Sequence, residues 1–220
     1  MQESPRGSAA VPTRLEDVQG DSRWMDMHER FVRIAKSSQA RVLFVGDSIT
    51  RLMEDTEAWD TLFKPLGSEN FGVGGDSTQH VLWRVQNGEL DSIDPKIIVL
   101  LIGTNNHDHT ASEIVVAIQA IIDVMLSKKP AAKILLLGVL PRGHRPNRLR
   151  EKIAEINASL ADFPKSNSSI RYMDVGHLFV DADGRISHED MHDYLHLTRR
   201  GYYKLCRPVY EEIVKVLDQS

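Results

Sequence analysis

The sequence alternates short apolar runs with longer segments of helical periodicity, and this alternation restricts the possible folds more than any other feature. Short apolar runs bounded by turn residues are typical of strands that are buried on both faces of a sheet. On this basis we predict five strands, at Val42–Val45, Asn70–Val73, Ile97–Ile102, Ile134–Leu140 and Ile170–Val175.

Amphipathic segments precede, separate and follow these runs. The clearest covers residues 111–128, where apolar side chains recur at helical spacing, at Ile114, Ile118, Ile121, Ile122 and Met125. We predict further helices over residues 23–37, 56–63, 77–90, 147–162 and 198–217. Strands that alternate with helices form a parallel sheet with helices on both faces. The prediction is therefore a three-layer α/β domain in the flavodoxin-like strand order, whose ligands bind at the carboxyl ends of the strands.

The composition fits a single folded domain. The chain has 220 residues, 41% of them hydrophobic, and this is enough apolar material for a full core, which excludes intrinsic disorder as the main state. A net charge of -4 argues against a nucleic-acid-binding protein, which would carry a clustered basic face. The single cysteine, Cys206, excludes a disulfide framework and a cysteine-rich zinc site.

The N-terminal residues differ in composition from the rest. Because Gly, Ser, Pro and charged residues dominate there, we expect residues 1–22 to be a flexible tail and residues 23–220 to be the folded domain. The tail holds no apolar run of signal-peptide length, and no stretch of the chain approaches the roughly 18 apolar residues of a membrane span. The scarcity of cysteine is compatible with a cytoplasmic protein.

Polar residues follow the predicted strands, at the edge where such a fold binds its ligand. They lie in the segments Gly46–Ile49, Gly72–Asp76, Gly103–His107 and Asp193–His196. Because the carboxyl ends of parallel strands share one edge, we expect these segments to gather there. Together they hold a hydroxyl, hydrogen-bond donors, an imidazole and a carboxylate, which are the groups that acyl transfer requires.

Ser48 is the candidate nucleophile. At a strand-to-helix junction its side chain can point outward, while its own N–H stays free to stabilise an oxyanion. The Gly75 N–H and the Asn105 side chain would complete an oxyanion hole with three donors. A plainer interpretation stays open, in which Ser48 or Asp47 is only a helix cap.

The glycine-rich segment after the second predicted strand has competing interpretations. Gly72, Gly74 and Gly75 are also what a simple turn requires. A dinucleotide-binding loop would need a third glycine at the position of Ser77, so the segment fails that pattern.

His196 is the candidate general base, and Asp193 is its candidate partner. In Asp193-x-x-His196 the short spacing can bring the carboxylate to one imidazole nitrogen, while the other nitrogen faces the nucleophile. A second pair of this spacing, Asp174 and His177, also lies near a strand end. We favour His196 because Leu197-Thr198 is a credible helix start that can fix its position, whereas Asp174 fits a strand-end turn.

The segment His188-Glu189-x-x-His192 matches a zinc-protease motif, in which two imidazoles one helical turn apart bind the metal beside a glutamate base. A third ligand could come from His196, Glu211 or Glu212. The polar surroundings indicate a short turn, and a zinc role for His196 would leave the serine and the oxyanion-hole candidates without a role. We therefore interpret these side chains as solvated residues at the rim of the site, together with His107-Asp108-His109.

The ordered set of segments resembles a known family. Four blocks are similar to those of the SGNH (GDSL-type) hydrolase superfamily: Gly46-Asp47-Ser48, Gly75, Gly103-Thr104-Asn105 and Asp193-x-x-His196. Longer strings resemble the catalytic subunits of intracellular type Ib platelet-activating factor acetylhydrolase: NFGVGGDSTQHVLWRVQNGEL, GTNNHDHT, LLGVLPRG and HDYLHLTRRGY. The similarity runs from about residue 23 to residue 217. It departs from many superfamily members at Asn106, where they have Asp.

The resemblance implies a serine esterase with the SGNH hydrolase fold. Its implied catalytic residues are Ser48 as nucleophile, His196 as general base and acid, and Asp193 as the partner of His196. Its implied oxyanion hole consists of Ser48, Gly75 and Asn105. A small acyl pocket at positions Ile49, Thr104 and Leu195 would favour acetyl esters, such as the sn-2 acetyl group of platelet-activating-factor-like phospholipids.

The resemblance also implies how the enzyme works and assembles. It implies no metal and no cofactor, a cytoplasmic homo- or heterodimer of catalytic subunits, and a WD40-repeat regulatory protein as a possible partner. Three alternatives stay open: a carbohydrate or other small-molecule O-acetylesterase, a subunit whose main role is partner binding, and a zinc hydrolase around His188 and His192.

Overall fold

Five short strands form one parallel sheet. In the computed structural model, which describes residues 8–15 and 23–218, they are β1 (Val42–Gly46), β2 (Ser68–Gly72), β3 (Ile97–Leu101), β4 (Lys133–Leu137) and β5 (Ile170–Met173). Their order across the sheet is β2-β1-β3-β4-β5, and every neighbouring pair is parallel. The predicted flavodoxin-like α/β architecture is confirmed.

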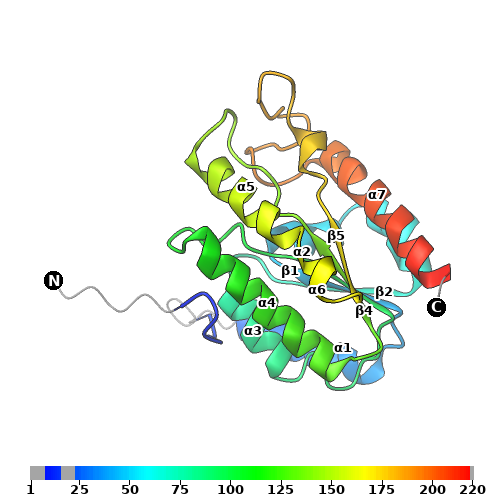
Figure 1. Cartoon of the computed structure of the whole chain (residues 1–220). Helices are drawn as coiled ribbons and strands as arrows, with labels where there is room; N and C mark the ends of the chain where they lie inside the picture. The colour runs from blue at the N-terminus through cyan, green and yellow to red at the C-terminus, as the bar shows by residue number, and fades with distance from the viewer. Residues whose placement is uncertain (1–7, 16–22, 219–220) are drawn as a thin grey trace.

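Helices cover both faces of this sheet (Figure 1). The longer ones are α1 (Arg23–Ser37), α3 (Thr78–Gln86), α4 (Ala111–Lys128), α5 (Arg148–Leu160) and α7 (Arg199–Asp218). The shorter ones are α2 (Ser48–Met53), η2 (Trp59–Phe63), η3 (Lys64–Leu66), α6 (Phe163–Ser166) and η4 (Gly176–Phe179). In the part of the chain that the structure describes, no helix is both long enough and apolar enough to cross a membrane.

The core lies on both sides of the sheet because side chains of a strand alternate between its faces. In β1, Leu43 and Val45 pack with the apolar sides of α1, α3, α4 and α5. Val42 and Phe44 point the other way and pack with α2, η2 and α7. All residues of β1 are buried, which explains why the strand has a continuous apolar sequence instead of an alternating one.

The fourth apolar run forms a shorter strand than predicted. β4 ends at Leu137, whereas we predicted Leu140. Beyond the strand, the side chain of Asn157 on α5 bonds the backbone of Val139: its Oδ1 accepts from the N–H at 2.8 Å, and its Nδ2 donates to the carbonyl at 3.0 Å. An amide side chain thus replaces the strand partner, and a buried apolar run can continue outside the sheet.

Other element boundaries also differ from the prediction. β2 begins at Ser68 because its polar first residues pair through the backbone with β1, and apolar patterning cannot show this. The predicted helix over residues 56–63 contains the π-helix η2, and the one over residues 77–90 ends at Gln86. β5 ends at Met173, two residues short of the predicted end. A helix start was predicted at Ser48, but α2 has no range among the predicted helices, since six residues are too few to show a helical period.

Residues 8–15 lie against α3. Ala9 is fully buried, and its carbonyl accepts a hydrogen bond from Thr78 Oγ1 at 3.0 Å. This placement differs from the flexible tail that we expected over residues 1–22. For residues 1–7 and 16–22 that expectation lies outside the described residues.

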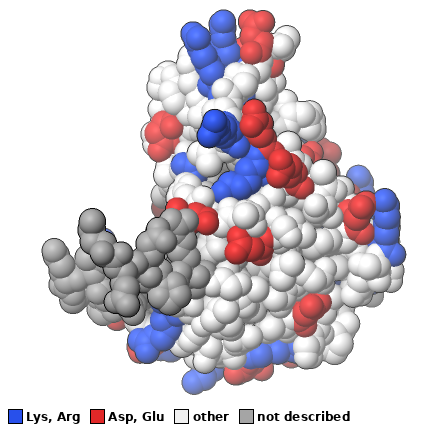
Figure 2. Space-filling view, turned by 60° about the vertical axis from the view of Figure 1, so that its left-hand side comes forward, with Lys and Arg blue, Asp and Glu red and all other residues white. Residues whose placement is uncertain are grey.

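Charged side chains of both signs are interspersed on the surface. On the face shown in Figure 2, basic and acidic residues lie next to one another, and much of the area carries neither. Such a face differs from the continuous basic surface that nucleic-acid-binding proteins present.

Candidate active site

Ser48 lies at the carboxyl end of β1, as the first residue of α2. The residue before it, Asp47, caps this helix: its Oδ1 accepts a hydrogen bond from the Ile49 N–H at 2.9 Å. Of the two residues that we considered as caps, Asp47 therefore fills that role. The half-buried hydroxyl of Ser48 is left free for other contacts.

Asp193 and His196 lie on the loop that precedes α7. Asp193 Oδ1 accepts from the backbone N–H groups of Leu195 at 3.0 Å and His196 at 2.7 Å, and its Oδ2 lies 2.6 Å from His196 Nδ1. Between them, Tyr194 adopts φ = 61°, a left-handed conformation that is uncommon for a bulky residue. The Tyr194 carbonyl is held by the Gly143 N–H at 2.8 Å. The loop thus folds around its own carboxylate, which fixes the imidazole.

A third contact connects this loop to α2. Ser48 Oγ lies 3.0 Å from His196 Nε2, so that serine, imidazole and carboxylate form one hydrogen-bonded series. Tyr202 on α7 donates to the Ile49 carbonyl on α2 at 2.7 Å, which holds the two helices together beside that contact. The structure therefore brings together the three residues that the sequence singled out.

Hydrogen bonds lower the pKa of the Asp193 carboxyl group. Burial raises its pKa, but hydrogen bonds from the His196 imidazole and from the N–H groups of His196 and Leu195 together outweigh this, and the pKa falls to about 2. Asp193 is therefore ionised at neutral pH. An ionised partner orients the imidazole and stabilises its protonated form.

Three hydrogen-bond donors follow the carboxyl ends of β1, β2 and β3: the Ser48 N–H, the Gly75 N–H and the Asn105 amide. Gly75 has φ = 82°, which explains why glycine stands there, and it is exposed. Asn105 donates one Nδ2 hydrogen to the Asp76 carbonyl at 2.9 Å, which orients the amide and leaves its second N–H for another acceptor. Within the described residues, the backbone N–H groups of Ser48 and Gly75 have no hydrogen-bond partner.

A buried cluster of charged side chains stabilises the loop that contains Gly75. The next residue, Asp76, accepts from Arg84 Nε at 2.8 Å, and Arg84 Nη1 lies 2.5 Å from Glu89 Oε2. Arg84 Nη2 also donates to the Phe71 carbonyl at 3.1 Å, in β2. Burial disfavours the charge of Arg84, but Glu89 and Asp76 outweigh it and hold its pKa above the usual range. One buried cation thus fixes the loop relative to the end of β2.

A buried carboxyl next to the nucleophile candidate makes the stability of the fold depend on pH. Burial raises the pKa of Asp47 to about 7, although the hydrogen bond from Ile49 opposes this. Because this folded pKa exceeds the ordinary value of 3.8, the stabilisation from protonated Asp47 is complete below about pH 4 and is lost as the pH rises through about 7. We expect the Asp47→Asn variant to lack this loss, which amounts to at most about 1.4 kcal/mol per pH unit.

Urea unfolding of the wild type and of Asp47→Asn at several pH values between about 5 and 8 measures this difference. Asp55→Asn serves as the control, since its exposed carboxylate lies just beyond α2. Parallel pH dependences for the wild type and Asp47→Asn would contradict the prediction.

The residues expected at the acyl pocket lie in two environments. Ile49 and Thr104 are buried, whereas Leu195 is half-buried and lines a surface hollow of about 460 Å³ together with Asp193 and Arg142. Arg142 Nη1 donates to the carbonyl and the hydroxyl of Thr104, at 3.0 and 3.2 Å. Arg142 is not among the site residues predicted from the sequence. The signal was its position shortly after β4, at the same sheet edge as the other polar segments.

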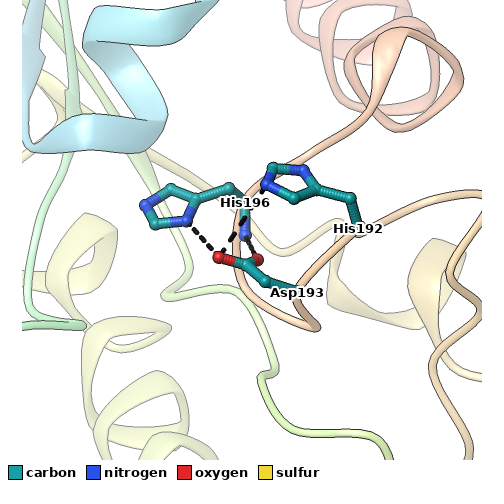
Figure 3. A group of neighbouring side chains, drawn as sticks. All are labelled: His192, Asp193 and His196. Carbon is teal, nitrogen blue, oxygen red and sulfur yellow. Dashed lines mark hydrogen bonds and ion pairs between the residues drawn. The ribbon is translucent and has the colours of Figure 1, made fainter.

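The zinc-protease motif does not form the site that its pattern suggests. Residues 188–192 make a turn and not a sustained helix, and His188 Nδ1 contacts the carbonyl oxygen of His192 at 2.9 Å. The other ligand candidates pair with arginines: Glu211 with Arg207, and Glu212 with Arg171. Among the described residues, the side chain of His192 instead lies next to those of Asp193 and His196 (Figure 3).

In the other two histidine-containing segments, hydrogen bonds stabilise a turn and a loop. Asp174 Oδ1 accepts from the Gly176 N–H at 2.8 Å, which makes the strand-end turn that we favoured over a pair with His177. Lys152 Nζ donates to the carbonyls of His107 at 3.0 Å and His109 at 2.9 Å, which fixes the loop after β3.

Comparison with known proteins places this geometry in a family. The model of the GDSL-like Lipase/Acylhydrolase family matches residues 44–204, a range that includes Ser48, Gly75, Asn105, Asp193 and His196. The chain belongs to this family. As a GDSL-like acylhydrolase, it is a serine ester hydrolase.

Relatives with substantial sequence identity support this membership. The GDSL-like hydrolase is 47% identical to subunit alpha2 of platelet-activating factor acetylhydrolase IB from Homo sapiens, over 100% of this chain and 96% of the relative. It is 48% identical to subunit alpha1 from Rattus norvegicus, over 96% of this chain and 91% of the relative.

Solved structures show the same fold at low sequence identity. A GDSL-like lipase from Bacteroides thetaiotaomicron superimposes with a TM-score of 0.74 and 20% identity, covering 86% of this hydrolase and 97% of that chain. A carbohydrate acetylesterase from Sinorhizobium meliloti gives a TM-score of 0.62 and 17% identity, covering 81% and 100%.

Proposed function

We propose that the chain hydrolyses acetyl esters through a triad of Ser48, His196 and Asp193. One observation carries the proposal: Ser48 Oγ lies 3.0 Å from His196 Nε2, and His196 Nδ1 lies 2.6 Å from Asp193 Oδ2. A nucleophile in contact with a base, and a base in contact with an orienting carboxylate, is the arrangement that activates a serine.

The reaction proceeds in two halves. Ser48 Oγ attacks the ester carbonyl carbon while His196 Nε2 takes the hydroxyl proton, and the protonated imidazole then gives this proton to the departing alcohol. The acetyl-enzyme that remains is attacked by a water molecule, whose proton passes to His196. Release of acetate returns the proton to Ser48. Asp193, ionised throughout, stabilises the imidazolium in both halves.

The proposed oxyanion hole consists of the N–H groups of Ser48 and Gly75 and the free N–H of the Asn105 amide. Hydrogen bonds within the protein hold the Asn105 amide and the loop beside Gly75 in place. The Asp76 carbonyl orients Asn105, and the buried Arg84 holds Asp76. Donors fixed before the reaction stabilise the developing charge without a reorganisation cost, and each is typically worth ~10²–10³ in rate.

We propose platelet-activating-factor-like phospholipids, cleaved at the sn-2 acetyl group, as the substrate class. The support is 47% identity along the whole chain to a subunit of platelet-activating factor acetylhydrolase IB. The side chains proposed for the acyl pocket, Ile49, Thr104 and Leu195, would leave room for a short acyl group. Sugar acetates are the alternative substrates, and sugar acetylesterases share this fold.

We also propose that the protein is cytoplasmic and assembles as a homo- or heterodimer of catalytic subunits. The relatives are named as subunits alpha1 and alpha2, which supports assembly with a second chain of this kind. A WD40-repeat regulatory protein is a further partner that the resemblance implies.

Hydrolysis of esters that differ only in acyl length tests the proposed activity. We expect kcat/KM for p-nitrophenyl acetate to exceed that for the octanoate by at least about tenfold, since single methylenes in a confined pocket change rates by ~10–200-fold. Leu195→Ala should narrow this ratio, whereas Val116→Ala, at an exposed position on α4 outside the hollow, should preserve it. Faster cleavage of the octanoate by the wild type would contradict the small pocket.

Acetate release from an alkyl-acetyl phospholipid and from an acetylated sugar, compared at equal ester concentration, decides the substrate class. Preferential release from the sugar would replace the phospholipid proposal.

A further inference from the structure

His192 is a second imidazole beside the proposed triad. Its side chain is exposed, and its Nε2 lies 3.9 Å from Asp193 Oδ2, the oxygen that also contacts His196 Nδ1. The two imidazole rings lie nearly parallel, with centroids 6.1 Å apart and an interplanar angle of 22°. Figure 3 shows that the carboxylate oxygen has one imidazole on each side.

The backbone holds these side chains in place. His192 and His196 are connected by a hydrogen bond from the His192 N–H to the His196 carbonyl at 3.2 Å, and Met191 pairs with Leu197 in an antiparallel bridge. The N–H groups of Leu195 and His196 bond the other oxygen of Asp193. The group is therefore a preformed cluster on one loop.

We propose that His192, Asp193 and His196 form a binding site for a zinc ion that reversibly inhibits the enzyme. One ligand atom from each residue lies within 4.8 Å of the others. Bonds of about 2.0–2.1 Å to a tetrahedral zinc ion place ligand atoms roughly 3.3 Å apart. The 3.9 Å pair must therefore approach and the 2.6 Å pair must separate, each by less than about 1 Å. The two imidazole nitrogens, which lie within 4.8 Å of each other, must approach by up to about 1.5 Å.

The donor set selects the class of cation. Two imidazole nitrogens and one carboxylate oxygen suit zinc, whereas magnesium and calcium prefer oxygen ligands. Three protein ligands from an exposed loop leave the fourth position of the ion to water. The site differs from the zinc-protease motif, because it uses His192 but not His188.

Binding at Nδ1 would remove the general base. A neutral imidazole carries one N–H, so coordination through the Nδ1 lone pair places the proton on Nε2. Nε2 is the nitrogen that faces Ser48, and with a proton already on it, it cannot accept the serine proton. This consequence rests on the function proposed above, whereas zinc binding itself does not.

Calorimetric titration of the full-length protein with zinc sulfate tests the site directly. We expect one zinc ion per chain, and a dissociation constant that His192→Gln raises at least about tenfold, since even loss of a group behind a ligand costs 10–100-fold. His177→Gln, which removes an exposed histidine from a different segment, should leave the dissociation constant unchanged, and magnesium should not compete. Equal zinc affinity for the wild type and His192→Gln would overturn the proposal.

The rate at which a fluorophosphonate labels Ser48 tests the inhibition. Saturating zinc should slow labelling at least about tenfold, because base catalysis contributes ~10²–10⁴ in rate, and a chelator should restore it. Zinc that binds without slowing the labelling would overturn the inhibitory role. If Ser48 is not labelled even without metal, the proposed function fails, and the calorimetric comparison still decides the metal site.

Discussion

Replacing Ser48 with alanine is expected to lower kcat toward p-nitrophenyl acetate by roughly 10⁴–10⁶-fold. The substitution removes the only atom of the proposed triad that bonds to the acyl group, so His196 and Asp193 lose their function as well. The fold should be unaffected, because Asp47 and not Ser48 caps α2. Initial rates together with fluorophosphonate labelling measure the effect, and the variant should incorporate no label.

Ser159→Ala provides the matched control for this substitution. Ser159 is an exposed serine on α5 whose hydroxyl bonds only a carbonyl of its own helix, at 3.2 Å. Its loss should leave the rate and the labelling unchanged. A folded Ser48→Ala variant with undiminished turnover would show that another residue is the nucleophile.

Replacing Arg84 with methionine is expected to lower the free energy of unfolding by about 3–5 kcal/mol. Methionine replaces the apolar stem of arginine but lacks the guanidinium, so the change removes the charge and its hydrogen-bond donors. Asp76 and Glu89, both with fully buried side chains, would then lose the cation that compensates their charges. The contact from Trp24 Nε1 to Asp76, at 2.7 Å, cannot replace an ion pair. Urea unfolding at neutral pH measures the difference.

Arg33→Met is the control for the cost of losing an arginine. Arg33 on α1 is largely exposed and lies 3.8 Å from Glu29, also exposed, and such pairs contribute about 0–1 kcal/mol. If Arg84→Met destabilised the protein no more than Arg33→Met, the buried cluster would not be important for stability.

The fold was predictable because its sheet is covered on both faces. Residues of β3 are all buried, so their sequence is apolar without interruption and is distinct from the helical stripe of α4. The parallel order then predicted that segments far apart in the sequence meet at one edge. Ser48 and His196, whose side chains are in contact, were identified in this way.

The contacts made through single side chains could not be predicted. Asn157 ends β4 by bonding Val139, and nothing in the apolar run around Val139 indicates a change of partner. Arg84 follows the buried Val81 by three residues in α3, but its charge predicts an exposed side chain. It is nevertheless completely buried, because two carboxylates meet it there. Such pairings depend on tertiary distances, to which periodicity is insensitive.

The compact loop that carries Asp193 and His196 determines how the proposed triad responds to disturbance. Because the carboxylate is bonded to the backbone and to the ring of the same short loop, these two residues shift together when the loop moves. Only the distance to Ser48 depends on how two separate elements are placed, and the Tyr202–Ile49 hydrogen bond connects α7 to α2 beside that contact. A motion of α7 relative to α2 would therefore break the contact between Ser48 and His196 while leaving the His196–Asp193 pair intact. Turnover would stop during this motion and would return fully once the contact was restored.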